Sequence, residues 1–268
     1  MGALDELLVV AVSVAREAAE LARRSRPSAI TDVGTKSSKT DVVTAADVAV
    51  EQLVRSRLAE LRPGEPVFGE ETGGETAAPG RVCWVVDPID GTVNYLYGYP
   101  SYAVSLAAQV DGVSVAAVVL EPVSGREWTA VRGGGSWCDG VPLRVSDATR
   151  LDLSLVATGF AYRVERREQQ AAGVARLLPQ VRDIRRAGAA SLDLCAVAAG
   201  WVDAYFEHGL SRWDWAGGAL VAEEAGAVVH LPDAVDAVGP DMTFCAAPGI
   251  ADGLRDLLED VGMTEKLP

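Results

Sequence analysis

Residues 82–92 read VCWVVDPIDGT, an apolar run followed by two aspartates three positions apart. The apolar run, residues 82–86, has the composition of a buried β-strand. Pro88 cannot continue a central strand, and Gly91 allows a ligand to approach the backbone closely. The sequence therefore predicts that Asp87 and Asp90 lie on a sharp turn at the carboxyl end of this strand, outside its paired part. Sites in α/β proteins are built at such strand ends.

The whole chain has the composition of a folded, acidic protein. Its 268 residues are 49% hydrophobic, enough for a sizeable core, and its formal net charge is -14. This charge argues against nucleic acid as a partner, since no large basic patch stands out. The start lacks a basic region, and the apolar residues 7–15 are too few to cross a bilayer, so we expect no signal peptide and no membrane anchor. The four cysteines form no CxxC pair, which favours a reducing cytoplasm.

Periodicity and turn residues predict alternating helices and strands on both sides of the motif. Helical spacing of apolar residues predicts helices over residues 4–24, 44–61, 165–178, 190–200 and 216–225. Strands are predicted over residues 67–68, 82–86, 102–110, 113–120, 127–131, 155–158, 181–185 and 204–207, and near Val228 and Phe244. Polar or glycine-rich loops are predicted over residues 31–40 and 72–80. This mixture, with no long linker, predicts layered sheets and helices.

Three acidic side chains fall at or just past predicted strand ends. Glu70 follows the strand at residues 67–68, and Asp87 and Asp90 follow the next one. Carboxylate oxygens suit magnesium or another hard divalent cation, and two histidines are too few for a histidine-rich zinc site. A single aspartate in a glycine-containing turn usually only caps that turn. The combination of three acids favours a metal site instead.

Thr92 and Asp47 are candidates for a shared hydrogen bond. Thr92 follows Gly91, where backbone N–H groups could hold phosphate oxygens while the hydroxyl approaches a water. Asp47 could accept the hydroxyl proton if the helix at residues 44–61 approaches the site. The segment Thr44-Ala45-Ala46-Asp47 also fits a helix capping box, and capping alone would explain both of its polar residues.

Asp214 stands apart from these acids in the sequence, at an expected helix start. It could cap that helix or reach the site, and the local sequence favours neither alternative. Its neighbours Trp213 and Trp215 fit core packing better than ligand contact.

These motifs together resemble the inositol monophosphatase family, magnesium-dependent and lithium-sensitive phosphatases, in its bacterial members. The resemblance is carried by Lys36 and by residues 41–47 (DVVTAAD), 69–71 (GEE), 87–92 (DPIDGT) and 213–214 (WD). It implies an α+β fold, a layered αβαβα sandwich with mixed sheets between helix layers. It also implies one domain over residues 1–268, with most metal ligands in residues 1–145 and the substrate contacts and Asp214 in residues 146–268. A homodimer is implied as well.

The resemblance assigns roles to particular residues. The metal ligands, for two or three Mg²⁺ ions per site, fall on Glu70, Asp87, the backbone carbonyl of Ile89, Asp90 and Asp214. The substrate contacts fall on Asp90, Gly91, Thr92, Gly188, Ala189, Ala190, Glu207 and Asp214. Catalysis is implied for Glu70, which would orient and deprotonate the attacking water, and for Thr92, assisted by Asp47. Lys36 could offset part of the negative charge, or it is an ordinary surface lysine.

The implied reaction is hydrolysis of a small phosphorylated polyol, myo-inositol 1-phosphate above all. The same chemistry could act on histidinol phosphate, fructose 1,6-bisphosphate or a phosphoadenosine nucleotide, but Glu207, placed to accept hydrogen bonds from ring hydroxyls, favours a polyol. A non-enzymatic alternative is a protein that binds the transcription machinery, as some bacterial relatives do. No nucleic-acid or membrane partner is expected.

Overall fold

Two β-sheets organise the computed structural model, which describes residues 2–29, 33–35, 42–232 and 238–265. The larger sheet has seven strands in sequence order, antiparallel except for the parallel pair β3–β4. Its strands are β3 (Val67–Gly69), β4 (Val82–Asp90), β5 (Ala103–Val110), β6 (Val113–Leu120), β7 (Glu127–Val131), β8 (Gly135–Cys138) and β9 (Val141–Pro142). A small two-stranded sheet joins β1 (Val33–Thr35) to β2 (Val42–Thr44).

The second large sheet has five strands in the order β11-β10-β12-β14-β13. The pairs of β10 with β11 and with β12 are parallel, whereas β14 pairs antiparallel with β12 and β13. Its strands are β10 (Leu155–Thr158), β11 (Asp183–Arg185), β12 (Ala204–His208), β13 (Val228–His230) and β14 (Met242–Ala246). Short 3₁₀ turns lie at Leu151–Leu153 and Leu178–Gln180.

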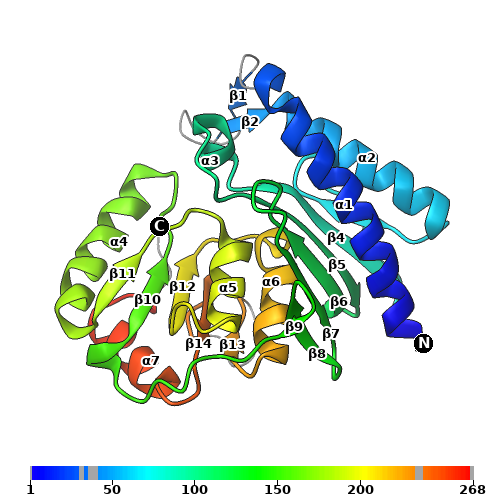
Figure 1. Cartoon of the computed structure of the whole chain (residues 1–268). Coiled ribbons are helices and arrows are strands. Elements are labelled where there is room, and N and C mark those ends of the chain that lie inside the picture. The colour runs from blue at the N-terminus through cyan, green and yellow to red at the C-terminus, as the bar shows by residue number, and fades with distance from the viewer. Residues whose placement is uncertain (1, 30–32, 36–41, 233–237, 266–268) are drawn as a thin grey trace.

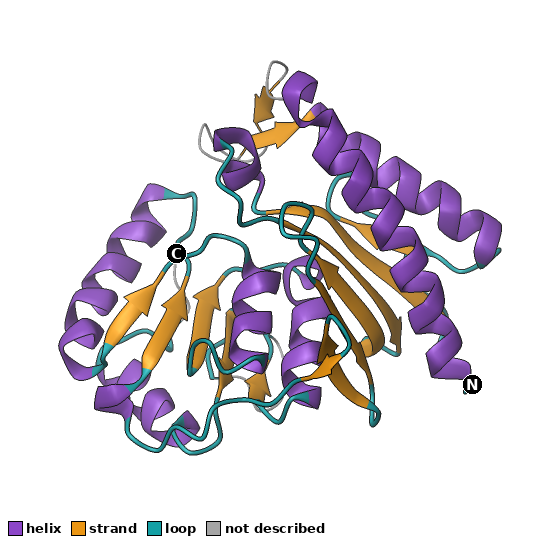
Figure 2. Cartoon of the chain, viewed as in Figure 1, coloured by secondary structure: helices purple, strands orange, loops and turns teal. Residues whose placement is uncertain are grey.

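Helices form three layers around these sheets (Figures 1 and 2), so the predicted αβαβα sandwich is confirmed. One outer layer covers the seven-stranded sheet, a middle layer separates the sheets, and the other outer layer covers the five-stranded sheet. The outer pair is α1 (Ala3–Ala29) and α2 (Ala45–Leu61), the middle pair is α5 (Ala190–Ala198) and α6 (Arg212–Glu224), and the last pair is α4 (Val164–Leu177) and α7 (Ala251–Asp260). Within the described residues, no helix is long and apolar enough to cross a bilayer.

The segment at residues 82–92 differs from the prediction in one respect. The strand does not stop at residue 86, because β4 continues through Asp87, Pro88 and Ile89 to Asp90 and still pairs with β5. The register shifts between Asp87 and Asp90, which places Pro88 in an irregularity where a missing N–H is tolerated. Asp87 and Asp90 are therefore buried residues in the paired end of β4. The expectation that they lie outside the paired part of the strand is wrong.

Two helices have other boundaries than predicted, α1 at its end and α6 at its start. The first helix extends to Ala29 even though Pro27 lies in its last turn. Arg26 ties this end to α3 (Thr92–Tyr97) by donating hydrogen bonds to two carbonyls there, which stabilises the extension. Helix α6 begins at Arg212, earlier than the predicted residue 216. The sequence analysis did not predict α3, α7, β8 or β9, although α7 is ten residues long and amphipathic. It also did not predict β1 and β2, and β1 lies within residues 31–40, where a loop was expected.

Candidate active site

One cavity, of about 410 Å³, is lined by most of the predicted site residues, which come from the ends of β4 and β12, the start of α3 and the segment that follows β11. The predicted residues that line it are Glu70, Asp87, Ile89, Asp90, Gly91, Thr92, Gly188, Ala190, Glu207 and Asp214. Asp47 and Ala189 are buried behind this lining. Lys36 lies outside the described residues.

Three of the carboxylates form a compact acidic cluster. Asp87, Asp90 and Asp214 each offer an oxygen within 4.8 Å of the others. Burial raises the pKa of Asp87 well above its ordinary value, and the charges of Glu70 and Asp90 raise it further. Burial likewise raises the pKa of Asp214 well above the ordinary value. Buried carboxylates that repel one another in this way provide an all-oxygen donor set for a hard divalent cation.

Asp90 is held from the far half of the chain. Its Oδ1 accepts a hydrogen bond from the backbone N–H of Ala190 at 3.1 Å, and its Oδ2 accepts one from the N–H of Ser191 at 2.7 Å. The Ser191 hydroxyl donates a further hydrogen bond to Oδ2. These bonds oppose the larger effect of burial, and the pKa of Asp90 is raised to about 6. Ser191 carries no motif signal of its own, so the sequence did not predict this contact.

Asp47 combines the capping and the site contact that the sequence left open. Its Oδ2 accepts hydrogen bonds from the backbone N–H and the hydroxyl of Thr44, at 2.8 and 2.6 Å, in a capping box at the start of α2. Its Oδ1 faces Thr92, whose hydroxyl lies 3.1 Å from that oxygen and 3.1 Å from the carbonyl of Ile89. One carboxylate therefore fixes the end of a helix and orients a hydroxyl at the cavity.

Asp214 also serves two purposes. It is the third residue of α6, and its Oδ2 accepts a hydrogen bond from the N–H of Ser211 at 2.6 Å, so it belongs to a capping box. The same side chain takes part in the acidic cluster. The preceding Trp213 packs against Phe68, with ring centroids 5.5 Å apart, and also lines the cavity. The core packing predicted for Trp213 thus accounts for only part of its surroundings.

Glu207 lies beside the acidic cluster on β12. The hydroxyl of Tyr205 donates a hydrogen bond to its Oε2 at 2.7 Å. Burial raises the pKa of Glu207 to about 7, although Tyr205 and the charge of Arg186 lower it. A Cβ on Gly159 would lie 1.8 Å from a Glu207 oxygen, so glycine at this position leaves the space that the carboxylate occupies.

Arginine side chains complete the cavity lining, and the sequence analysis did not predict them. Arg163 and Arg166 lie at the start of α4, and Arg186 follows β11. They come from elements that bear no acidic motif. Only the three-dimensional structure brings them to the acidic residues.

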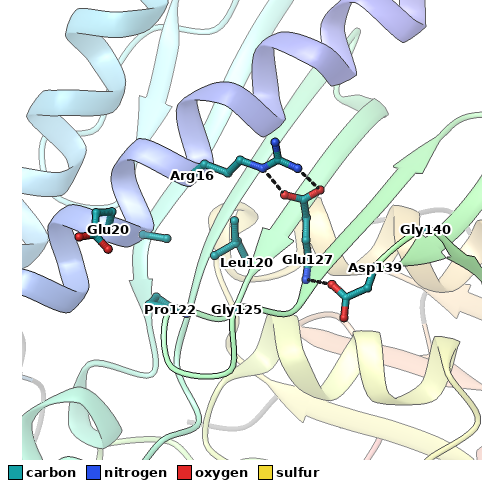
Figure 3. A pocket seen from close by; sticks show the side chains of 9 residues that line it. Arg16, Glu20, Leu120, Pro122, Gly125, Glu127, Asp139 and Gly140 are labelled. Carbon is teal, nitrogen blue, oxygen red and sulfur yellow. Dashed lines mark hydrogen bonds and ion pairs between the residues drawn. The ribbon is translucent and has the colours of Figure 1, made fainter.

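A second hollow, of about 570 Å³, lies between α1 and the turn from β6 to β7 (Figure 3). Its Arg16 donates two hydrogen bonds to Glu127, at 2.7 and 3.1 Å, and the backbone N–H of Glu127 donates one to Asp139 at 2.9 Å. The charged groups are thus already paired with one another. Although this hollow is larger, it holds neither the acidic cluster nor a convergent set of donors, so we place the candidate site in the other cavity.

Comparison with known proteins agrees with this geometry. The profile described as the inositol monophosphatase family matches residues 3–260. The inositol-1-monophosphatase of Mycobacterium leprae is 51% identical over 273 residues, covering 95% of this chain and 94% of the relative. The Nus factor SuhB of Pseudomonas aeruginosa is 42% identical over 233 residues, covering 84% of this chain and 85% of the relative. The solved structure of Mycobacterium tuberculosis SuhB matches with a TM-score of 0.83 and 43% identity, covering 97% of this chain and 98% of that one.

The fold and the matches define a phosphatase that hydrolyses phosphate monoesters. The chain belongs to the inositol monophosphatase family, as its motifs predicted. Members of this family are generally metal-dependent, and the acidic cluster could bind metal.

Proposed function

We propose that the protein hydrolyses the phosphate monoester of a polyol, with myo-inositol 1-phosphate as its substrate, and that Mg²⁺ is required. The observation that carries the proposal is the cluster of Asp87, Asp90 and Asp214, with oxygens within 4.8 Å, in the cavity that Glu207 also lines. The name of the Mycobacterium leprae relative supports inositol 1-phosphate as the substrate. Histidinol phosphate, fructose 1,6-bisphosphate and phosphoadenosine nucleotides are the alternative substrates.

The donor set fits Mg²⁺. Glu70, Asp87, the carbonyl of Ile89, Asp90 and Asp214 all line the cavity and offer only oxygen atoms. We propose that they hold two or three ions. When bound, the ions supply positive charge that stabilises the phosphate and the leaving alkoxide and favours ionisation of a nearby water.

The chain's own residues would orient the reactants. We propose that Glu70 orients the attacking water and accepts its proton, and that the Thr92 hydroxyl, positioned by Asp47, fixes the same water. Backbone N–H groups at Gly91 and Thr92 would hold phosphate oxygens. Glu207, positioned by Tyr205, would accept hydrogen bonds from ring hydroxyls, with Gly188, Ala189 and Ala190 forming the adjoining wall.

The substrate assignment predicts the outcome of one side-by-side assay. Phosphate release is measured with Mg²⁺ on inositol 1-phosphate, histidinol phosphate, fructose 1,6-bisphosphate and a 3'-phosphoadenosine nucleotide. We expect the highest kcat/KM for inositol 1-phosphate, because Glu207 can accept bonds from several ring hydroxyls. A higher kcat/KM for any of the other three compounds would show that this compound is the better substrate, while the proposed hydrolysis of a phosphate monoester would stand. Lack of release from all four would contradict the proposed reaction.

The acidic cluster also predicts how stability depends on pH and magnesium. The pKa of Asp90 is raised from 3.8 to about 6, and those of Asp87 and Asp214 are raised well above ordinary values, so the metal-free folded state binds more protons than the unfolded state. The contribution of these three carboxyl groups to stability is therefore fully present below their ordinary pKa values and is lost as pH rises through the folded pKa values. For Asp90 the change corresponds to about 3 kcal/mol.

We expect the Tm of the chelator-treated protein to fall between pH 5 and pH 8, and Mg²⁺ to raise it more at pH 8. The difference between the two Mg²⁺ effects should be about 5 °C or more, since about 2–4 °C accompanies each kcal/mol in a chain of this size. Differential scanning fluorimetry at both pH values measures this. An equal Mg²⁺ effect at pH 5 and pH 8 would show that the cluster does not bind the ion.

The setting and assembly of the enzyme are part of the proposal. We propose a cytoplasmic homodimer; the four free cysteines support a reducing compartment. Light scattering of the purified protein tests the dimer. The Nus factor relative raises a second function, contact with the transcription machinery. A pull-down with RNA polymerase tests it, and binding retained by an inactive variant would separate that role from hydrolysis.

A further inference from the structure

Helix α5 begins without a side-chain cap of its own. The residue before it, Ala189, offers no side-chain acceptor to the backbone N–H groups that a helix start leaves unpaired. Asp90 supplies this acceptor from a distant part of the sequence. Its Oδ1 accepts a hydrogen bond from the N–H of Ala190 at 3.1 Å, and its Oδ2 accepts one from the N–H of Ser191 at 2.7 Å. An acid of the seven-stranded sheet therefore caps a helix of the middle layer.

The hydroxyl of Ser191 adds a bond to Asp90 that the helix backbone does not provide. It donates to Oδ2 of Asp90, the same oxygen that accepts from the Ser191 N–H. Ser191 is fully buried and Asp90 nearly so. A hydrogen bond to an ionised carboxylate is stronger than one between neutral groups. An alanine at position 191 would keep the backbone bond and lose only the hydroxyl bond, so one substitution can isolate this contact.

These bonds leave the two oxygens of Asp90 in different states. A carboxylate has about four acceptor positions, two on each oxygen. Oδ2 accepts two hydrogen bonds from Ser191, whereas Oδ1 accepts one from Ala190. The remaining acceptor position is therefore on Oδ1. Because Asp90 belongs to the acidic cluster with Asp87 and Asp214, the Ser191 hydroxyl determines which oxygen of Asp90 stays available to a cation there.

Ser191 is itself held in place by the contact between α5 and α6. A Cβ on Gly218 would lie 2.7 Å from the carbonyl oxygen of Ser191 and 2.8 Å from the Cβ of Leu194, so the glycine allows the two helices to approach closely. Gly218 lies about one helical turn after Asp214 on α6. Ser191 thus contacts the helix that carries Asp214 through its backbone, while its hydroxyl holds Asp90.

We propose that Ser191 is a positioning residue of the metal site, whose hydroxyl holds the Asp90 carboxylate in the orientation that binds the cation. The inference rests on the proposed function, because it requires Mg²⁺ at the acidic cluster. Ser191 does not line the cavity, so it acts through Asp90. Without the hydroxyl, Asp90 is held at α5 by two backbone N–H groups alone, and its Oδ2 has a free acceptor position.

The test is Ser191→Ala, with Mg²⁺ binding to the substrate-free protein measured by isothermal titration calorimetry at constant pH. We expect the dissociation constant of Mg²⁺ to rise about tenfold or more, the usual effect of removing a group that orients a metal ligand. The Mg²⁺ concentration for half-maximal phosphate release from myo-inositol 1-phosphate should rise by a similar factor. At saturating Mg²⁺, kcat should return close to the wild-type value, because every proposed ligand atom is still present.

Ser154→Ala is the matched control. Ser154 is also fully buried, and its hydroxyl donates a hydrogen bond to the carbonyl of Arg150 at 2.7 Å. It lies just before β10 and does not line the cavity. Both variants lose one buried hydroxyl bond, so thermal melts should show a lower Tm for each. Only Ser191→Ala should change the dissociation constant of Mg²⁺.

The affinities and rates together decide the inference. An unchanged dissociation constant in Ser191→Ala, or an equal change in Ser154→Ala, would overturn it and show that the Ser191 hydroxyl only stabilises the start of α5. A kcat that stays low at saturating Mg²⁺ would also count against a role in positioning the ligand. Lack of Mg²⁺ binding by the wild-type protein would instead contradict the proposed function. Weaker Mg²⁺ binding in Ser191→Ala alone, with kcat restored by excess Mg²⁺, would support the inference.

Discussion

Asp90→Asn should lower phosphatase activity by about 10²–10³-fold while the protein stays folded. Removing one group that stabilises transition-state charge typically has an effect of this size. Asparagine has the shape of aspartate but lacks its charge, and one of its two terminal atoms is a donor. It cannot accept from Ala190 and Ser191 and also present a charged oxygen to the cluster with Asp87 and Asp214.

The metal-free stability of this variant should move in the opposite direction from its activity. Burial and neighbouring acids raise the pKa of Asp90 to about 6, so its ionised form is costly at neutral pH without a cation. We expect the metal-free Tm of Asp90→Asn at pH 8 to equal or exceed that of the wild type, with a smaller rise on adding Mg²⁺. Phosphate-release kinetics and thermal melts measure the two effects.

Asp183→Asn is the control for this substitution. Asp183 is exposed on β11 and pairs with Arg185, so it should keep wild-type activity and the full response to Mg²⁺. Turnover of Asp90→Asn near that of the wild type at saturating Mg²⁺ would exclude Asp90 from the proposed metal site.

The acidic part of the site was predictable because its information is local in the sequence. Asp87 and Asp90 follow an apolar run, and Glu70 follows a shorter one, so strand ends alone place them at one edge of the sheet. The pattern could not show that β4 continues to Asp90, because Pro88 argues against a paired strand unless a register shift accommodates it. Local signals thus predicted which residues matter but not how deeply they are buried.

The rest of the site depends on contacts between distant parts of the chain. Ser191 and Asp90 are separated by 101 residues, and no spacing rule joins them. The same holds for Arg163 and Arg186, which look like ordinary surface arginines in the sequence. The αβαβα layering was predicted through family resemblance, since periodicity predicts helices and strands but not the order in which sheets and helices stack.

Glu51 illustrates a residue that the motifs do not mark and that should nevertheless have a large effect. It is fully buried on α2 and accepts hydrogen bonds from the backbone N–H groups of Glu71 and Thr72, at 2.7 and 3.1 Å. It also pairs with Arg55, which donates to the carbonyls of Val67 and Gly73. The pair therefore binds both ends of the segment that carries Glu70.

Glu51→Ala should destabilise the protein by about 3–5 kcal/mol, because it leaves Arg55 and the N–H groups of the loop without their buried partner. At about 2–4 °C per kcal/mol, the Tm should fall by roughly 10 °C. Below this Tm, kcat should fall more than KM rises, since Glu70 loses its support while the phosphate contacts at β4 remain. Glu60→Ala, on the exposed face of the same helix, should change the Tm by less than about 2 °C. Equal melting temperatures for the two variants would show that the loop carrying Glu70 is held by other contacts.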